Sequence, residues 1–245
     1  MFAKKSNLTA SLHVIKESQA VKLDSVVPWG RSFEEYRSIF ALSEDDLQKR
    51  LLGCGDGPAC FNAELTQRGG NVVSVDPVYQ FSGDQIRSRI DEVYSQIMSQ
   101  MEQNADNYIW ESIKDVAELG KVRMAAMQQF LSDYESGLEA GRYACASLPT
   151  LPFDDQQFEL ALCSHFLFLY SDHFDLEQHI QGMKELCRVA AEVRVYPLLS
   201  LDGRQSKHLS AVIEALEGDG ILTSLQAVDY QFQRGATEML VAYAV

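Results

Sequence analysis

Short apolar runs and helix-type periodicities take turns along most of this chain. The apolar runs are bounded by turn residues and predict strands at residues 50–52, 72–75, 143–146, 158–163 and 192–197. Segments with helical spacing or helix-capping residues lie before, between and after them, at residues 33–40, 44–49, 59–68, 176–189 and 206–216. Strands that alternate with helices are typical of an α/β domain with a parallel sheet.

The end of the chain departs from this alternation. Two further strands are predicted at residues 227–233 and 238–245, separated only by Arg234-Gly235-Ala236. A connection this short fits a hairpin, whereas parallel strands need a long crossover. The last strand should therefore run antiparallel to its neighbour.

A different periodicity occupies residues 83–141. Apolar residues recur at steps of three and four from Ile86 to Met101, as on one face of an amphipathic helix. Shorter patterns predict two more helices, one from Ile109 to a stop at Gly120 and one over residues 127–138. A crossover needs only about a dozen residues, so we interpret this segment as an all-helical insertion within a single domain over residues 1–245. The insertion is either a lid or wall over an acceptor pocket or an arm that forms a homodimer.

Charge and composition narrow the function classes. The chain has 21 basic and 35 acidic residues, a net charge of −14. Nucleic-acid binding needs clustered Lys and Arg, and anionic membranes repel an acidic surface, so neither is an expected partner. No apolar stretch reaches the roughly 20 residues of a membrane helix, and we expect a cytoplasmic protein. The 5 cysteines and 5 histidines form no metal-binding motif, so no metal is expected.

The pattern with the clearest chemical meaning is a glycine loop between a predicted strand and a predicted helix. Gly53, Gly55 and Gly57 allow a ligand to approach the backbone, and the helix that follows offers free N–H groups. Asp76 ends the next strand, where a carboxylate can accept hydrogen bonds from the ribose hydroxyls of an adenosine-bearing cofactor. A dinucleotide fold would place its third glycine at residue 58, which is proline here, so a nicotinamide oxidoreductase is disfavoured.

This spacing resembles motif I of the class I S-adenosylmethionine (SAM)-dependent methyltransferases. The resemblance continues in Leu-Pro-Phe at residues 151–153, in the strand behind it, and in the terminal hairpin. The segments at residues 27–32, 54–59 and 76–81 also resemble a bacterial group of uncharacterised methyltransferase-like proteins. The resemblance implies an α/β, Rossmann-like fold with a mostly parallel seven-stranded sheet and an antiparallel last strand.

The resemblance also implies SAM as the cofactor and a set of residues around it. The residues implied to bind it are Arg31, Gly53, Cys54, Gly55, Gly57, Asp76, Pro77, Ser147, Leu148 and Ser164. Arg31 follows Trp29 and Gly30 and either reaches the carboxylate of SAM or is a surface arginine. His165 is the candidate general acid–base residue, because histidine titrates near neutral pH; the alternative is a structural histidine.

The leading hypothesis is methyl transfer from SAM to a small-molecule acceptor. The Asn/Asp-Pro-Pro-Tyr motif of the amino-methylating nucleic-acid enzymes is missing after the fourth strand, where Ser164 and His165 stand instead. The alternative is a non-catalytic SAM- or nucleoside-binding protein whose helical insertion binds a partner. It is motivated by Leu51 and Ser147, which occupy positions where the family often has acids.

Overall fold

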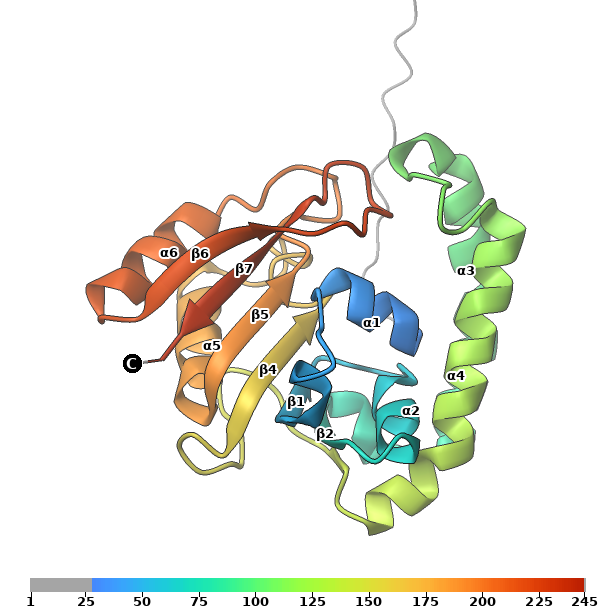
Figure 1. Ribbon diagram of the computed structural model, residues 1–245. Coiled ribbons are helices and arrows are strands. Elements are labelled where there is room, and N and C mark those ends of the chain that lie inside the picture. The colour runs from blue at the N-terminus through green and yellow to red at the C-terminus, as the bar shows by residue number, and fades with distance from the viewer. Residues whose placement is uncertain (1–27, 245) are drawn as a thin grey trace, which may run out of the picture.

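The computed structural model describes residues 28–244, so the start of the predicted domain and Val245 of the predicted last strand lie outside the described residues. Its centre is a seven-stranded sheet with the order β3-β2-β1-β4-β5-β7-β6 (Figure 1). The strands are β1 (Arg50–Cys54), β2 (Asn71–Val75), β3 (Tyr143–Ala144), β4 (Phe158–Ser164), β5 (Ala190–Tyr196), β6 (Leu222–Ala227) and β7 (Glu238–Tyr243). The first five pair in parallel, whereas β7 runs antiparallel to both β5 and β6. The predicted fold class is confirmed.

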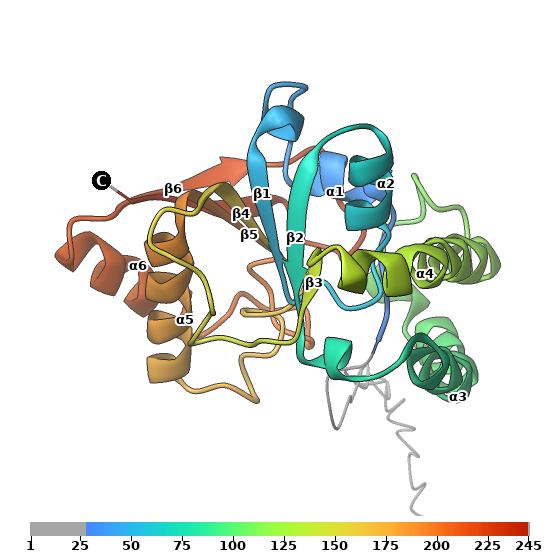
Figure 2. The same ribbon diagram turned by 90° about the horizontal axis from the view of Figure 1, so that it is seen from below.

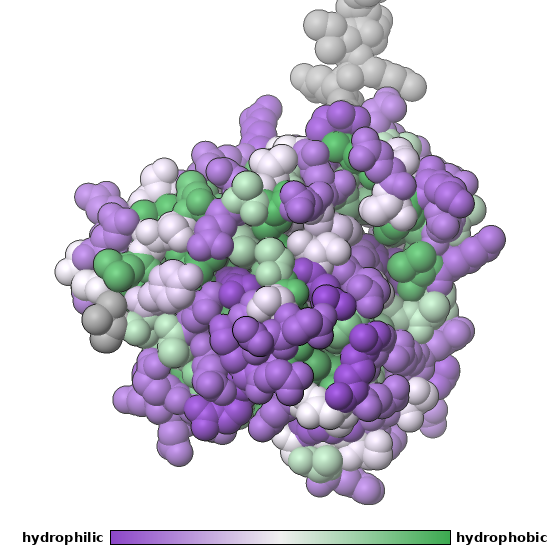
Figure 3. Space-filling model, in the orientation of Figure 1, coloured by the Kyte–Doolittle hydropathy of each residue, from purple (hydrophilic) through white to green (hydrophobic). Residues whose placement is uncertain are grey.

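Helices cover both faces of the sheet (Figure 2). They are α1 (Phe33–Ile39), α2 (Phe61–Gln67), α3 (Gly83–Gln103), α4 (Val116–Glu139), α5 (Leu176–Val189) and α6 (Leu209–Gly218), with short 3-10 helices η1 (Asp46–Gln48), η2 (Pro77–Gln80) and η3 (Ala105–Asn107). Because side chains alternate along a strand, Leu51 packs with α1 and α2 in one core, whereas Leu52 packs with α5 and α6 in the other. Polar side chains dominate the face drawn in Figure 3, in keeping with the charged composition.

The segment 83–141 contains two long helices, α3 and α4, where the sequence predicted three. The apolar stripe of α3 is buried as expected, from Ile86 to Met101. Gly120 lies inside α4 and does not end a helix. A Cβ atom there would lie 2.4 Å from the hydroxyl of Tyr94 on α3, so this glycine permits the two helices to touch. In this sequence Gly120 therefore marks a close contact between two helices and not the end of a helix.

The predicted strand at residues 227–233 is wrong, because β6 comes earlier, at Leu222–Ala227. Residues 228–237 form the β6–β7 loop, which replaces the predicted three-residue turn. Val228, Tyr230 and Phe232 are each at most 8% exposed and pack in the core beside α1. The alternation of these apolar residues resembles that of a strand, but in the structure they belong to a loop in which every second side chain is buried.

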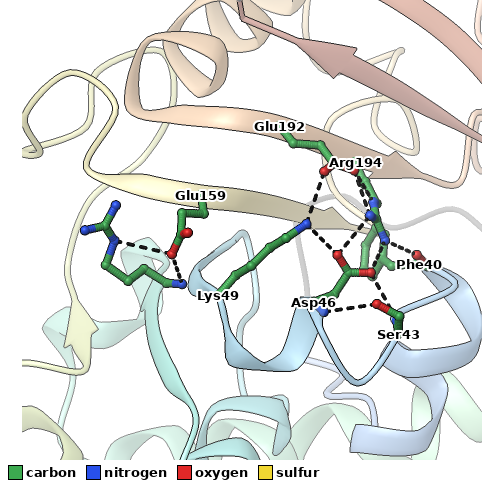
Figure 4. Close-up of polar contacts among 8 residues, drawn as sticks. Phe40, Ser43, Asp46, Lys49, Glu159, Glu192 and Arg194 are labelled. Atoms are coloured by element: carbon green, nitrogen blue, oxygen red, sulfur yellow. Dashed lines mark hydrogen bonds and ion pairs between the residues drawn. The ribbon is translucent and has the colours of Figure 1, made fainter.

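A largely buried ion-pair cluster connects the α1–β1 segment to β5 (Figure 4). Arg194 on β5 donates to the carbonyl of Phe40 at 2.8 Å and to Asp46 at 3.2 Å. Lys49 bonds Asp46 at 2.6 Å, and Glu192 bonds Arg194 at 2.7 Å. The helix predicted at residues 44–49 is in fact the short η1, whose Asp46 belongs to this cluster. The cluster holds the end of α1 against the sheet.

Candidate functional site

The glycine loop lies at the carboxyl ends of β1, β2 and β4. The N–H of Gly55 donates to the carbonyl of Val75 at 2.9 Å, which joins the loop to the end of β2. Gly55 and Gly57 have φ angles of 70° and 51°, in the left-handed region that favours glycine. A Cβ atom at Gly55 would lie 2.7 Å from the ring of Phe166, so this ring lies directly over the loop.

Asp76 joins the glycine loop to the start of η2. Its Oδ2 accepts from the N–H of Gly57 at 2.9 Å and its Oδ1 from the N–H of Val78 at 2.8 Å. The hydroxyl of Tyr79 donates to the carbonyl of Gly57 at 2.7 Å. Each carboxylate oxygen can accept a further hydrogen bond. Burial raises the pKa of Asp76. Asp76 therefore both holds the loop and presents acceptors to a ligand.

Asp56, inside the glycine loop, is a site residue that the sequence analysis did not single out. Its carboxylate is buried and accepts from the hydroxyls of Tyr36 at 2.7 Å and Ser74 at 2.6 Å. Burial raises its pKa to about 6. A Cβ atom at Gly53 would lie 1.8 Å from Asp56 Oδ2, so this first glycine makes room for a carboxylate of the protein itself.

Two cavities meet at the glycine loop and share Gly57, Asp76 and Phe166. We call the smaller one, of about 150 Å³, the inner cavity, and the larger one, of about 710 Å³, the outer cavity. The inner cavity is lined by the loop, the ends of β4 and α3, and the β6–β7 loop. The outer cavity lies between η2 and the start of α3.

The structure brings most of the predicted site residues to these cavities. Those that line the inner cavity are Arg31, Gly55, Gly57, Asp76, Ser164 and His165, and those that line the outer one are Gly57, Asp76 and Pro77. Gly53, Cys54, Ser147 and Leu148 line neither of them. Cys54 is buried in β1 beside Cys163, its in-register partner on β4, and Leu148 packs toward Gly182 of α5. The roles assigned to all these residues stay predictions.

His165 follows β4 in a left-handed conformation, with a φ of 51°. Its N–H donates to the carbonyl of Tyr196 at 2.7 Å, and its Nδ1 lies 3.0 Å from the Ser164 hydroxyl. Burial, assisted by the positive charges of Arg31 and Arg123, lowers the pKa of His165 well below its ordinary value. The imidazole is therefore neutral near pH 7 and could accept a proton, although a low pKa makes it a weak base.

A second group that sequence reasoning missed connects the helical segment to the core. Glu35 on α1 bonds Arg123 on α4 and accepts from the hydroxyl of Tyr230 at 3.0 Å. Burial alone would raise the pKa of Glu35, but the attraction of Arg123 and its hydrogen bond hold it at about 2. Arg123 lines the inner cavity. No sequence motif marks this pair, because its partners lie 88 residues apart.

The described part of the chain offers no group of three or more His, Cys, Asp and Glu side chains that could hold a metal ion. None of its helices combines the length and apolar character needed to cross a membrane.

The strand order and the antiparallel β7 define a Rossmann-like fold of the class I methyltransferase type, with its candidate site at the carboxyl ends of the parallel strands. No protein-family model matches the chain. In sequence it is similar to an uncharacterised protein of Methanocaldococcus jannaschii, at 29% identity over 225 residues, which cover 90% of this chain and 97% of that protein.

Solved structures also resemble this chain. One is the magnesium protoporphyrin IX methyltransferase of Synechocystis PCC 6803 with bound SAH, with a TM-score of 0.46 and 14% identity over 87% of this chain and 83% of that one. Another is a SAM-dependent methyltransferase of Aquifex aeolicus, with a TM-score of 0.43 and 14% identity over 86% of this chain and 93% of that one.

Proposed function

We propose that this protein transfers a methyl group from SAM to a small-molecule acceptor. The observation that carries the proposal is the meeting of the glycine loop with Asp76: the two are hydrogen-bonded to each other, and both line the inner and the outer cavity. A backbone loop and a carboxylate at adjacent strand ends suit the ribose of an adenosine-bearing cofactor.

The cavities suit the two ends of SAM. The outer cavity, at about 710 Å³, is in the size range of ligand pockets, and Pro77 and Val78 in its wall would pack against the adenine. Asp76 would accept from the ribose hydroxyls, and Ser164 and Arg31 would face the amino-acid end in the inner cavity. SAM would supply a methyl group on a sulfonium. The chain would supply position, which accounts for much of the rate in such a displacement.

The small size of the acceptor follows from the inner cavity. Its volume of about 150 Å³ is similar to that of an engineered cavity known to hold benzene. The acceptor would share this space with the amino-acid end of SAM, so no more than a ring-sized part of it can enter. His165 lines this cavity in its neutral form and would take the proton of an acceptor that arrives protonated.

The helical segment 83–141 is proposed as a wall of the acceptor site. Ile97 and Met101 of α3 and Tyr108 beyond it line the inner cavity. The N–H of Ile109 donates to the carbonyl of Phe232 at 2.8 Å, and the rings of Tyr108 and Phe232 stack at 4.9 Å, so the segment also contacts the β6–β7 loop. These contacts favour a role in closing the site over the alternative of a dimerisation arm.

The non-catalytic binding protein stays the second candidate, favoured by the volume of the inner cavity. The amino-acid end of SAM would itself occupy a large part of about 150 Å³, which leaves little room for an acceptor. Product formation separates the two candidates, because a binding protein would hold SAM without consuming it in the presence of acceptors.

Isothermal titration with SAM, S-adenosylhomocysteine and NAD tests the cofactor. SAM and S-adenosylhomocysteine should bind and NAD should not. Asp76→Asn should weaken binding about 5- to 150-fold, since the ribose hydroxyls lose a charged acceptor worth about 1–3 kcal/mol. Asp84→Asn is the matched control, because Asp84 also lines the outer cavity but is exposed. NAD binding without a response to either SAM species would refute the proposal.

A further inference from the structure

Two arginines face the inner cavity with unused hydrogen-bonding capacity. Arg31 precedes α1 and Arg123 lies on α4, where it is 1% exposed. Within residues 28–244, the Nε atom of each arginine is buried and has no hydrogen-bond partner. The hydrogen bond that Arg31 donates there runs from Nη1 to the carbonyl of Trp29, at a long 3.4 Å. Buried polar groups in native proteins are nearly always paired, so this pair of guanidiniums needs an explanation.

The carboxylate that bonds Arg123, Glu35, is fully engaged. Besides Arg123, it accepts from the N–H and the hydroxyl of Ser32, each at 3.0 Å, and from the hydroxyl of Tyr230 at 3.0 Å. The other carboxylate nearby in the loop, Asp56, already accepts from two hydroxyls. Among residues 28–244, Glu35 is the carboxylate that both bonds Arg123 and attracts Arg31, so two buried positive charges share one close negative charge.

The excess positive charge is felt by Arg31. Its burial, together with repulsion by Arg123, lowers the pKa of Arg31, and the attraction of Glu35 only partly offsets this. A buried charge without a partner is costly to the fold. The side chain of Arg31 contributes little in return to the described structure, through one long hydrogen bond. This combination is typical of a group kept for a ligand and not for stability.

We propose that Arg31 and Arg123 together form a receptor for one carboxylate group of a ligand in the inner cavity. One negative charge would balance the excess, and both arginines line the cavity that would hold it. The apolar remainder of the ligand would lie against Trp29, Tyr108 and Phe232, which line the same cavity. The volume of about 150 Å³ limits that remainder to the size of one ring or a short chain.

Two ligands of the proposed function carry this chemistry, and the inference rests on that function only in naming them. The carboxylate belongs either to the amino-acid end of SAM or to the acceptor. In both cases Arg123, which comes from the helical segment, is a binding residue. This gives α4 a direct part in the site.

Three probes distinguish the two sources in isothermal titrations. S-adenosylhomocysteine carries the amino-acid carboxylate, 5′-methylthioadenosine has the same nucleoside and thioether without it, and benzoate is a ring-sized carboxylate. If SAM is the source, the wild type should bind S-adenosylhomocysteine at least about tenfold tighter than 5′-methylthioadenosine, and Arg31→Gln should abolish this preference. If the acceptor is the source, benzoate should bind the protein loaded with 5′-methylthioadenosine, and Arg31→Gln should weaken benzoate at least about tenfold.

A thermal melt separates a ligand receptor from a structural arginine. Arg31→Gln without ligand should melt at or above the wild-type temperature, because the variant loses a buried cation that Arg123 repels. Arg123→Lys is the second variant, and it keeps the charge that pairs with Glu35. Its affinity should fall for the same probe as in Arg31→Gln, but by a smaller factor. Arg50→Gln is the control, since the Arg50 side chain is 57% exposed and lies outside both cavities.

The proposal is overturned if Arg31→Gln binds every probe as the wild type does, or if the variant melts well below it. Failure of the methyltransferase proposal looks different, because neither nucleoside probe would then bind. In that case benzoate binding to the protein alone, weakened in Arg31→Gln, would still support the receptor. The absence of benzoate binding as well would overturn both.

Discussion

Two buried clusters of charge stand at opposite ends of α1, and they differ in how well their charges balance. At the C-terminal end, Arg194 and Lys49 face Asp46 and Glu192 in a closed set of ion pairs (Figure 4). At the other end, Glu35 is the carboxylate, among the described residues, that bonds Arg123 and attracts Arg31. The balanced cluster lies outside both cavities, whereas the unbalanced one opens on the inner cavity. In this protein, the cluster with balanced charges is structural, whereas the cluster with excess positive charge is the one proposed to bind a ligand.

Asp56 extends the comparison to a carboxylate without a cation. It is held by hydroxyls, so burial raises its pKa, whereas the pKa of Asp46, which would also be raised by burial, is held at about 2 by Lys49, Ser43 and Arg194. The candidate site thus has excess positive charge near Arg31 and, in the glycine loop, a carboxyl group, Asp56, whose pKa is raised. Such separated, imperfectly paired charges are common where ligands bind.

The largest effect is expected from neutralising the single anion of the unbalanced cluster. Glu35→Gln keeps the shape and the capping hydrogen bonds of α1 but leaves Arg123 without a counter-charge. The free energy of unfolding in urea should fall by about 3–5 kcal/mol, the cost of breaking a buried pair from one side. A loss below about 1 kcal/mol would mean that Arg123 finds another anion and that the cluster is not short of negative charge.

The next effect is a dependence of stability on pH that comes from Asp56. Its folded pKa of about 6 lies above its ordinary value of 3.8, so the stability that this group contributes is complete below pH 4 and is lost as the pH rises through 6. The expected loss is about 3 kcal/mol at 1.4 kcal/mol per pKa unit.

Urea unfolding of the wild type and Asp56→Asn at pH 5 and pH 8 measures this loss. The variant should be more stable than the wild type at pH 8, and the difference should shrink at pH 5. An equal difference at both pH values would mean that Asp56 is already ionised in the folded protein at pH 5.

The smallest effect is expected in the balanced cluster. Asp46→Asn should lower the free energy of unfolding by about 1–2 kcal/mol, because Glu192 still pairs with Arg194 and Lys49. It should leave the affinity for S-adenosylhomocysteine and for benzoate unchanged. A variant that loses ligand affinity would show that the two clusters are coupled through α1, and would weaken the contrast between them.

Local patterns of the sequence were enough for much of the fold. The strands β1, β2, β4 and β5, the buried stripe of α3 and the capping box of Ser32 with Glu35 all follow from spacing along a short segment, and each is present in the structure. The same holds for the glycine loop and Asp76, because successive parallel strands end at one edge of the sheet.

Features that depend on distant contacts escaped the sequence. The alternation of Val228, Tyr230 and Phe232 predicted a strand. In the structure β7 pairs instead with β6, at residues 222–227, and these three side chains pack in the core. Gly120 suggested a helix end, but only the neighbouring α3 shows that the glycine serves close packing.

The sequence by itself determined the succession of the five parallel strands along the chain and which of their ends form the candidate site, because each strand and the turn that follows it are encoded in one short segment. Only the tertiary structure decided which charges are paired. Arg123 meets Glu35 across 88 residues, and Arg194 meets Asp46 across 148. The electrostatics of a buried charge depend on its spatial neighbours and its burial, and neither is written in the local pattern. For that reason the charge imbalance between Arg31, Arg123 and Glu35 is visible only in the tertiary structure.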